Sequence, residues 1–336
     1  MKSSRYLSIG LLLLLYVSSY ATFSIVAVDP LTGQVGSAGA SCSDGSGCGG
    51  CGGVVVINGI VPGVGAINAQ GVTCFPDLNL QNGMNWMRAG HTPSQIISDL
   101  TAHDKCFQGG VSQRQYGIVG FDDNDNPVVA TYTGSGCAGY ASQRIGYNYS
   151  IQGSNLLGKE VLDSMAARFE RETGSLACKL MAALQAAKVV GADTRCAAAG
   201  VSSLSSYLRV AESDDESPNF FINLVVSGTP EGVDPIDELQ SLFDQSYSCT
   251  VPVGITQIKG KSFLIYPNPA SDIFHIRSGS TIREVMIYDM LGNQVVAEAP
   301  ASPVYSWDVQ QMPDGMYMVR VRTDAGWSLD RLIVSR

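Results

Sequence analysis

The distribution of cysteines constrains the fold of this chain more than any other feature of its sequence. All nine cysteines lie between Cys42 and Cys249 of a 336-residue chain. Charge follows the same division: acidic residues outnumber basic residues 22 to 11 over residues 22–250, whereas residues 251–336 hold 8 of each. We therefore expect two parts of different composition. An apolar content of 45% is enough for packed cores, which excludes a largely disordered chain.

Residues 1–21 have the pattern of a secretory signal peptide. Lys2 and Arg5 precede an apolar run over residues 9–17, and small residues follow up to Ala21. This run is too short for a membrane-spanning helix, and no other stretch approaches the length that a span needs. We therefore expect cleavage by signal peptidase after Ala21, export through the periplasm, and no membrane span in the mature chain. Cleavage after Ser19 is a second chemically acceptable site, and a hydrophobic first strand is the plain alternative.

Export makes disulfides the first expectation for the cysteines, because the compartment is oxidising. The odd number leaves at least one thiol free or paired with another chain. Cys48 and Cys51 have a C-x-x-C spacing within the Gly- and Ser-rich residues 42–53. Zinc binding is an alternative to a disulfide-stapled loop there. The sequence does not give the connectivity.

Apolar periodicity predicts alternating blocks of strands and helices before residue 246. Strands are expected at residues 22–28, 34–40, 54–57, 64–67, 116–121, 127–132, 147–152, 196–210 and 220–226. Helices are expected at residues 78–89, from residue 93, at residues 159–169, 176–184 and 235–243, with Thr92 as the N-cap before Pro93. Such blocks, in place of strict β-α-β units, favour antiparallel sheets covered by helices.

Residues 246–262 are polar and contain Pro252 and Gly254, which predicts a linker. Beyond it, short apolar segments are separated by turn residues. Strands are expected at residues 274–276, 285–288, 295–297, 304–309, 316–322 and 328–334. Their close spacing predicts a small all-β sandwich over residues 263–336.

Three segments of this C-terminal part carry a resemblance to a known family. They are Tyr266-Pro267-Asn268-Pro269-Ala270-Ser271-Asp272, residues 285–292 and residues 312–321. Together they resemble the type A C-terminal sorting domain of the Bacteroidetes type IX secretion system. The resemblance implies recognition by the type IX secretion machinery, passage across the outer membrane, and removal of this domain with release or surface attachment. A generic adhesive β-sandwich is the alternative.

Several segments before residue 246 carry a second resemblance. They are residues 22–33, 87–93, 147–158, 160–162, 191–195 and 234–239. They resemble the DUF1028 family, a group placed in the N-terminal-nucleophile (Ntn) hydrolase superfamily. The resemblance implies that residues 22–245 form an α+β domain, an Ntn-hydrolase-like αββα four-layer sandwich. The chain departs from the family pattern at Ser154, where the family commonly has Asn, and after Arg195, where alanines replace a polar run.

Thr22 would be the first residue of the chain after cleavage at Ala21. An N-terminal Thr supplies both a nucleophile and a base. Its hydroxyl attacks a carbonyl, and its free α-amine, with an ordinary pKa of about 7.7–8.0, accepts the proton. The Ntn resemblance and the position of Ala21 both indicate Thr22 as a catalytic nucleophile. The alternative is that Thr22 only begins an edge strand.

Three further residues are candidates for supporting catalytic roles. Asp193 and Arg195 are two apart, so they would point the same way on a strand. They could orient the amine of Thr22 or hold an anionic substrate, or form a surface ion pair of little energetic consequence. Asn155, expected where a strand meets a helix, could donate to an oxyanion or only start the helix. Ser24 shares a strand face with Thr22 and could support it.

The sequence offers no clear pattern for a metal or a cofactor. Its histidines, His91, His103 and His275, have no partner at metal-ligand spacing, and a Ser-His-Asp triad would need one of the first two. No P-loop, dinucleotide-binding glycine run or H-E-x-x-H motif is present. The acidic residues 122–126 could suit Ca²⁺ but lack the Gly and distal Glu of a calcium loop, so an exposed hairpin turn is expected. The net charge of −9 argues against nucleic-acid binding.

We interpret the sequence as a secreted or cell-surface protein with two domains. The first is expected to be an amidohydrolase that cleaves a small amide or peptide bond through an acyl-Thr22 intermediate and needs no cofactor. The main alternative is an exported, disulfide-stapled binding protein that keeps the Ntn scaffold without catalysis. A structural surface protein is a third. The second domain is expected to serve as a transport signal.

Overall fold

The computed structural model describes residues 22–45, 50–249, 263–290, 292–323 and 326–336. The chain divides into two compact units between residues 251 and 252. The predicted signal peptide lies outside the described residues, and so does the predicted linker from residue 250 onward. Within the described ranges, no helix has both the length and the apolar character needed to cross a membrane.

The first unit contains two antiparallel sheets. The six-stranded sheet has the order β10-β9-β2-β1-β8-β7, and the four-stranded sheet has the order β3-β4-β5-β6. The larger sheet comprises β1 (Thr22–Val28), β2 (Val35–Ser41), β7 (Tyr140–Ile145), β8 (Tyr149–Leu156), β9 (Ser205–Ala211) and β10 (Ile222–Val226). The smaller sheet comprises β3 (Asn58–Val61), β4 (Gly65–Gly71), β5 (Arg114–Phe121) and β6 (Pro127–Thr133).

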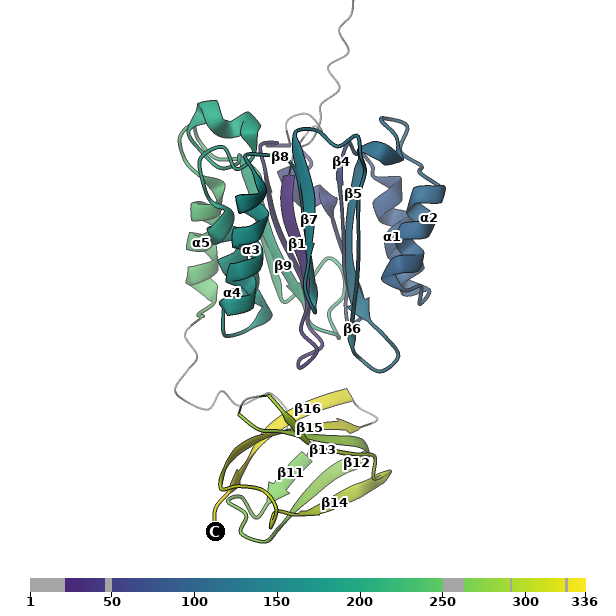
Figure 1. The fold of residues 1–336 in the computed structure, drawn as a ribbon, viewed down its shortest axis with the longest axis vertical. Helices are drawn as coiled ribbons and strands as arrows, with labels where there is room; N and C mark the ends of the chain where they lie inside the picture. Colours follow the sequence, from purple (N-terminus) through teal and green to yellow (C-terminus); the bar gives the residue numbers. More distant parts are fainter. Residues whose placement is uncertain (1–21, 46–49, 250–262, 291, 324–325) are drawn as a thin grey trace, which may run out of the picture. The chain divides into compact units, whose positions relative to one another are not determined.

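Helices cover the outer face of each sheet (Figure 1). Helices α1 (Leu78–Arg88) and α2 (Pro93–Ala102) pack on the four-stranded sheet. Helices α3 (Lys159–Arg171), α4 (Leu176–Ala187) and α5 (Pro235–Ser246) pack on the six-stranded sheet. The two sheets face each other, because β1 contacts β4 and β5 contacts β8. The layers of this unit are therefore helices, sheet, sheet and helices, and antiparallel sheets covered by helices are what the block pattern of the sequence predicted.

Alternation along β1 sends its side chains into two different layers. Phe23 and Ile25 belong to the core between the six-stranded sheet and its helices. Val26 packs instead with buried residues of the four-stranded sheet. Thr22 and Ser24 belong to the same alternating set as Val26, so they face the interior between the two sheets. The fold therefore places the first residue of β1 between the sheets and not at a solvent-exposed edge.

The helix-start signal at Thr92 is confirmed, and Asp234 caps a further helix in a similar way. Thr92 caps α2, and its side chain and that of Gln95 form a reciprocal capping box ahead of Pro93. Asp234 caps α5 by accepting a hydrogen bond from the amide of Ile236. Such caps satisfy backbone amides that have no partner within the helix, which fixes where each helix begins.

The strand predicted at residues 54–57 is wrong, because residues Gly53–Ile57 form a 3-10 helix. Gly52 and Gly53 take left-handed φ angles of 94° and 72°, which turn the chain sharply before the β-branched run. The amide of Val54 then donates to the side chain of Ser205 in place of a neighbouring strand. Turn geometry thus outweighs the local β-propensity of the valines.

The strand predicted over residues 196–210 is only partly correct. Residues Thr194–Ala199 form a 3-10 helix that Asp193 caps and that Gly200 ends at a φ of 71°. Strand β9 begins only at Ser205. Asp193 and Arg195 therefore do not share a strand face, contrary to expectation. Strand β7, at the edge of the six-stranded sheet, was not predicted.

The second unit is an all-β domain, as predicted. Strand β12 (Ile273–Tyr288) is its longest and pairs with four others. The remaining strands are β11 (Phe263–Tyr266), β13 (Gln294–Glu298), β14 (Ser302–Asp308), β15 (Gly315–Thr323) and β16 (Gly326–Val334). Its core is made of buried side chains such as Phe274, Ile287 and Val319.

Disulfides join most of the described cysteines, which confirms the first expectation for them. The bonds are Cys42–Cys196, Cys74–Cys106 and Cys178–Cys249. Cys51 is also disulfide-bonded, which removes its thiolate from the zinc alternative, whereas Cys48 lies outside the described residues. Cys137 is the free cysteine among those described, and burial raises the pKa of its thiol.

Candidate functional site

Thr22 begins β1 and lines a cavity of about 260 Å³. Its side chain is buried, and its Oγ1 donates a hydrogen bond to the Oγ of Ser41 across 3.3 Å. Ser41 ends β2, and the antiparallel register, in which Phe23 faces Ala40, brings it opposite Thr22. The cavity lining also includes Ser41, Ser43, Gln70, Thr73, Val54 and Val56.

Arg195, which is paired with Asp193, contacts the same hydroxyl pair through Ser41. The Arg195 Nη2 lies 2.7 Å from Asp193 Oδ2, its Nε lies 3.0 Å from Oδ1, and Nη2 also donates to the Oγ of Ser41 at 3.3 Å. Asp193 is completely buried and also accepts from the amide of Cys42 at 2.8 Å, while Arg195 is 29% exposed. The predicted residues Thr22, Asp193 and Arg195 are thus brought together through Ser41. Because Asp193 is completely buried, the Asp193–Arg195 pair is not the surface ion pair that was the alternative to a supporting catalytic role.

The Cys42–Cys196 disulfide fastens this arrangement. Cys42 directly follows Ser41, and Cys196 directly follows Arg195, so the bond joins the two backbone positions beside the hydrogen-bonded pair. The bond links residues 154 positions apart in the sequence. Cross-linking distant segments removes freedom mainly from the unfolded chain, and here it also fixes the approach of Arg195 to the end of β2.

Asn155 lies close to this group but outside the cavity lining among the residues described. It follows Ser154, which pairs with Thr22 in the β1–β8 register. Asn155 has a left-handed φ of 55°, its amide donates to the carbonyl of Ala138 at 2.7 Å, and its own carbonyl accepts from the Thr194 hydroxyl at 2.9 Å. It lies within β8, four residues before the start of α3, so the interpretation of Asn155 as a helix-start residue is wrong.

Gln70 of β4 holds Thr22 from the opposite sheet. Its Nε2 donates to the carbonyl oxygen of Thr22 at 3.2 Å and to Oε1 of Gln115 at 3.1 Å. Its Oε1 accepts a hydrogen bond of 2.5 Å from Ser24, whose face was correctly assigned. Gln115 in turn donates to the carbonyl of Gly153 in β8. This buried chain of amides connects both sheets at the residue that begins β1, and the sequence analysis missed Gln70.

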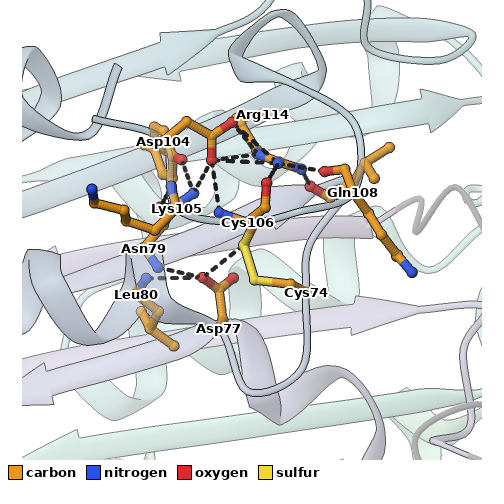
Figure 2. The surroundings of a disulfide bond; sticks show 11 residues. Cys74, Asp77, Asn79, Leu80, Asp104, Lys105, Cys106, Gln108 and Arg114 are labelled. Carbon is orange, nitrogen blue, oxygen red and sulfur yellow. Dashed lines mark hydrogen bonds and ion pairs between the residues drawn. A yellow bond between two sulfur atoms is a disulfide. The ribbon is translucent and has the colours of Figure 1, made fainter. Parts of the chain in front are cut away.

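A second disulfide, whose surroundings Figure 2 shows, contributes Cys74 to the cavity lining. Cys74 and Cys106 are bonded to each other, and the residues that follow them, Phe75 and Phe107, also line the cavity. This wall was not predicted from the sequence. Its signal was present in the repeated Cys-Phe dipeptide, although the pairing of the two cysteines could not be derived.

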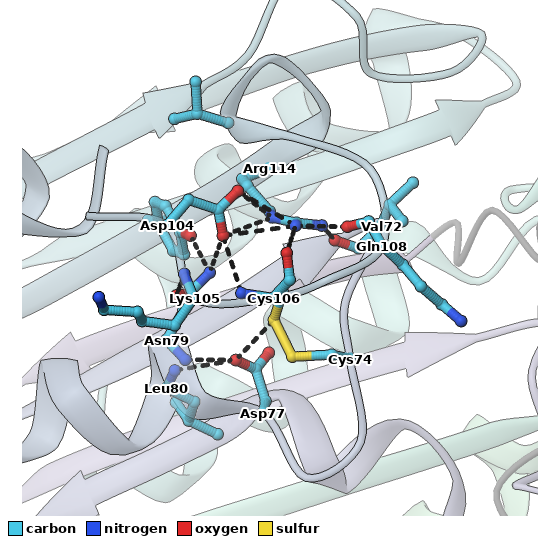
Figure 3. Close-up of polar contacts among 12 residues, drawn as sticks. Val72, Cys74, Asp77, Asn79, Leu80, Asp104, Lys105, Cys106, Gln108 and Arg114 are labelled. Carbon is cyan, nitrogen blue, oxygen red and sulfur yellow. Dashed lines mark hydrogen bonds and ion pairs between the residues drawn. A yellow bond between two sulfur atoms is a disulfide. The ribbon is translucent and has the colours of Figure 1, made fainter. Parts of the chain in front are cut away.

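A buried arginine anchors the segment that carries Cys106 (Figure 3). The guanidinium of Arg114 lies 3.1 Å from Asp104 and donates to the carbonyl oxygens of Val72, Cys106 and Gln108. Because a guanidinium offers five donors in a fixed plane, one side chain fixes three backbone positions and a carboxylate together. The wall is therefore held by a disulfide and by a buried ion pair.

Asp77 lies beneath this disulfide at the start of α1. Its carboxylate accepts hydrogen bonds from the amides of Asn79 and Leu80, which cap the helix. Burial raises the pKa of the Asp77 carboxyl, against the lowering effect of these hydrogen bonds. Asp77 lies close enough to Cys74 and Cys106 for metal binding, but the two sulfurs are bonded to each other and are not thiolates.

The other residues that the sequence singled out lie away from the cavity lining. His91 lies 3.4 Å from Asp99, and His103 contacts the carbonyl of the same residue at the end of α2. Residues 122–126 form the expected hairpin turn, in which Asp122 accepts hydrogen bonds from the amides of Asn124 and Asn126. These hydrogen bonds lower the pKa of Asp122.

Comparison with known proteins adds two family matches. Residues 22–239 match the family described as "Family of unknown function (DUF1028)", and residues 264–335 match a "Secretion system C-terminal sorting domain". No curated protein matches the chain.

Two solved structures resemble parts of this chain. A crystal structure of a DUF1028 protein from Silicibacter pomeroyi covers 68% of this chain and 90% of its own, with 23% identity and a TM-score of 0.51. This likeness concerns the fold alone. PorZ, a surface component of the type IX secretion system of Porphyromonas gingivalis, covers 39% of this chain and 21% of its own, with 14% identity and a TM-score of 0.21.

The two family matches settle where the chain belongs and what its C-terminal part is for. A type IX sorting domain over residues 264–335 indicates secretion or attachment to the cell surface, and it implies interaction with the type IX secretion machinery. The match over residues 22–239 covers more than half of the chain, so this protein is a member of the DUF1028 family.

Proposed function

We propose that residues 22–245 form an Ntn-hydrolase-like domain that cleaves a C–N bond in a small amide or peptide. The observation that carries this proposal is the position of Thr22: it begins the central strand β1 and lines the cavity between the sheets. The order of layers, with two facing sheets between helices, agrees with the αββα arrangement that the Ntn resemblance implies. The proposal includes removal of residues 1–21 as a signal peptide.

The proposed reaction uses the hydroxyl and the free α-amine of Thr22. Oγ1 attacks the carbonyl carbon of the amide while the amine takes the hydroxyl proton. The tetrahedral intermediate then collapses: the C–N bond breaks, and the proton passes from the α-ammonium group to the leaving amine. Water attacks the resulting Thr22 ester with the amine again as base. The ester bond breaks, the carboxylic acid leaves, and Oγ1 regains its proton.

The surrounding residues are proposed to position this nucleophile. Ser41 accepts the hydrogen bond of Thr22 Oγ1, and Arg195 donates to Ser41 while Asp193 fixes the guanidinium. Asn155 is proposed as an oxyanion donor because it follows the strand partner of Thr22. Since its side chain is not among the described lining residues, its amide would have to turn towards bound substrate.

The proposal is tested by trapping the covalent intermediate. The chain is recovered from a secreting host, mixed briefly with 4-nitrophenyl acetate, quenched in acid so that the acyl group cannot migrate to nitrogen, and mapped by mass spectrometry. We expect acetyl on Oγ1 of Thr22, none at this position in Thr22→Ala, and slower acylation in Thr22→Ser. A chain with one extra residue before Thr22 should also fail to react, because it lacks the free amine.

The alternative of a binding protein without catalysis makes the opposite prediction. Such a protein would show no acetylated Thr22, and its ligand binding would survive both Thr22→Ala and the blocked amine. An ester hydrolysis rate that Thr22→Ala leaves unchanged would likewise contradict the proposed mechanism, because another group would then be responsible.

A further inference from the structure

The cavity beside Thr22 has an uncharged lining. Among its described lining residues none is Asp, Glu, Lys, Arg or His. Apolar side chains are prominent, and they include Val54, Val56, Ile57, Phe75 and Phe107. A charged group placed there would lose its hydration without gaining an opposite charge from the lining, which is costly. Arg195 does not supply that charge, because it pairs with Asp193 and does not line the cavity among the described residues.

Phe75 and Phe107 are exposed at this cavity although both are large and apolar. Phe75 is 60% exposed and Phe107 is 80% exposed. The exposure of Phe107 does not come from a loosely held backbone. The buried Arg114 binds the carbonyls of both neighbours of Phe107, Cys106 and Gln108, and Cys106 is tied to Cys74. The backbone on both sides of Phe107 is therefore fixed, and its ring extends from this backbone largely exposed.

A second cavity extends the apolar space on the far side of Phe75. It has a volume of about 250 Å³ and shares Val56, Ile57, Thr73, Cys74 and Phe75 with the cavity at Thr22. Its further lining includes Ala69, Leu80 and Met84, together with Gln81 and the carboxyl group of Asp77. The two cavities therefore adjoin at a shared, largely apolar set of residues, and the Asp77 carboxyl offers no positive charge to an anionic ligand.

We infer that the acyl part of the substrate is uncharged and apolar, with the size of a medium-length aliphatic chain, and that Phe75 and Phe107 select it by packing against it. This inference rests on the proposed function, because it assigns the acyl side of the scissile bond to the Thr22 cavity. Convergent apolar walls with a few polar groups at one end are typical of sites for small organic ligands. Here Thr22, Ser41 and Gln70 supply the polar end.

The test measures binding apart from catalysis. The chain carrying Thr22→Ala is titrated with hexanamide and with glutaramate, an amide of similar length that ends in a carboxylate, and binding is followed by NMR. We expect hexanamide to bind and glutaramate to bind at least about tenfold more weakly, because the lining offers no counter-charge. Added Phe107→Ala or Phe75→Ala should each weaken hexanamide binding about fivefold by removing apolar contact area.

Leu31→Ala is the matched control. Leu31 is 52% exposed and lies in the β1–β2 turn, at the end of that hairpin opposite Thr22, so its removal should leave hexanamide binding unchanged. Equal binding of the two amides would overturn the inference, and so would hexanamide binding that neither Phe substitution affects. If hexanamide binds as expected but the wild-type chain forms no acyl-Thr22, the assignment of the apolar pocket is supported and the proposed catalysis is refuted.

Discussion

The hydroxyl of Thr22 donates a hydrogen bond to the hydroxyl of Ser41 across 3.3 Å, between the first residue of β1 and the last residue of β2. Ser41 also accepts from Arg195, whose carboxylate partner Asp193 is completely buried. A single hydroxyl therefore connects the proposed nucleophile to the charged pair. The Cys42–Cys196 disulfide holds the segments on both sides of this connection together.

Ser41→Ala should slow the proposed reaction without preventing folding. The variant removes the acceptor that orients Thr22 Oγ1, and loss of one such hydrogen bond costs about 1 kcal/mol, which corresponds to a five- to tenfold lower kcat. KM should change little, because the apolar lining is intact. Steady-state kinetics with an amide substrate check this result. Ser43→Ala, at another serine of the cavity lining, is the control, and an equal loss in both variants would argue against a specific role for Ser41.

Arg195→Ala should destabilise the first unit. The change leaves the buried carboxylate of Asp193 with the backbone amides of Cys42 and residue 195 but without its charged partner, which costs roughly 1–3 kcal/mol. Urea unfolding at neutral pH measures the loss. Adding Asp193→Asn should recover part of it, because the buried charge is then gone. Unchanged stability in Arg195→Ala would contradict the burial and pairing described for Asp193.

The stability contribution of Asp77 should depend on pH. Burial raises the pKa of its carboxyl, so the folded state favours the protonated form. That contribution is fully present below the carboxyl's ordinary pKa and is lost as pH rises through the raised folded value. Asp77→Asn keeps a helix-capping side chain without the charge. Denaturant unfolding of both chains between about pH 4 and pH 7 should show Asp77→Asn gaining stability relative to wild type as pH rises. A constant difference would refute the prediction.

Removing the Cys74–Cys106 disulfide should destabilise the cavity wall. The bond closes a loop with a sequence separation of 32, for which the chain-entropy model gives roughly 3–4 kcal/mol. Guanidinium unfolding of the chain with Cys74→Ser and Cys106→Ser measures the loss. The free cysteine supplies a control, because Cys137→Ser removes no covalent bond and should have a small effect. Equal stabilities of the two variants would show that Arg114 alone holds the wall.

Local sequence signals predicted much of the fold. Thr92 followed by Pro93 marks the start of α2, and alternation along residues 22–28 gives β1 and the faces of Thr22 and Ser24. The prediction failed where longer-range contacts decide the conformation. Residues 53–57 carry a β-branched run but curl into a 3-10 helix after two left-handed glycines, with an amide bound by Ser205, 151 positions away from Val54.

The residues of the candidate site were likewise predicted only in part from the sequence. Thr22 was predicted from family resemblance and the position of Ala21, and Asp193 and Arg195 from their spacing on an expected strand. The structure brings the three together through Ser41, which was not predicted. Gln70 and Arg114 were also missed, because a buried polar side chain is recognisable only once its partners are known. Gln70 lies 48 positions from the Thr22 carbonyl that it binds, and no local pattern encodes that contact.

The most direct test of the central claim is the identity of the residue that begins the secreted chain. Intact-mass measurement and N-terminal peptide mapping of protein recovered from a secreting host determine it. The account predicts a chain that begins with Thr22 and carries an unmodified α-amine. A chain that begins at Tyr20, or a Thr22 with a blocked amine, would contradict the account, because Thr22 could not then serve as its own base.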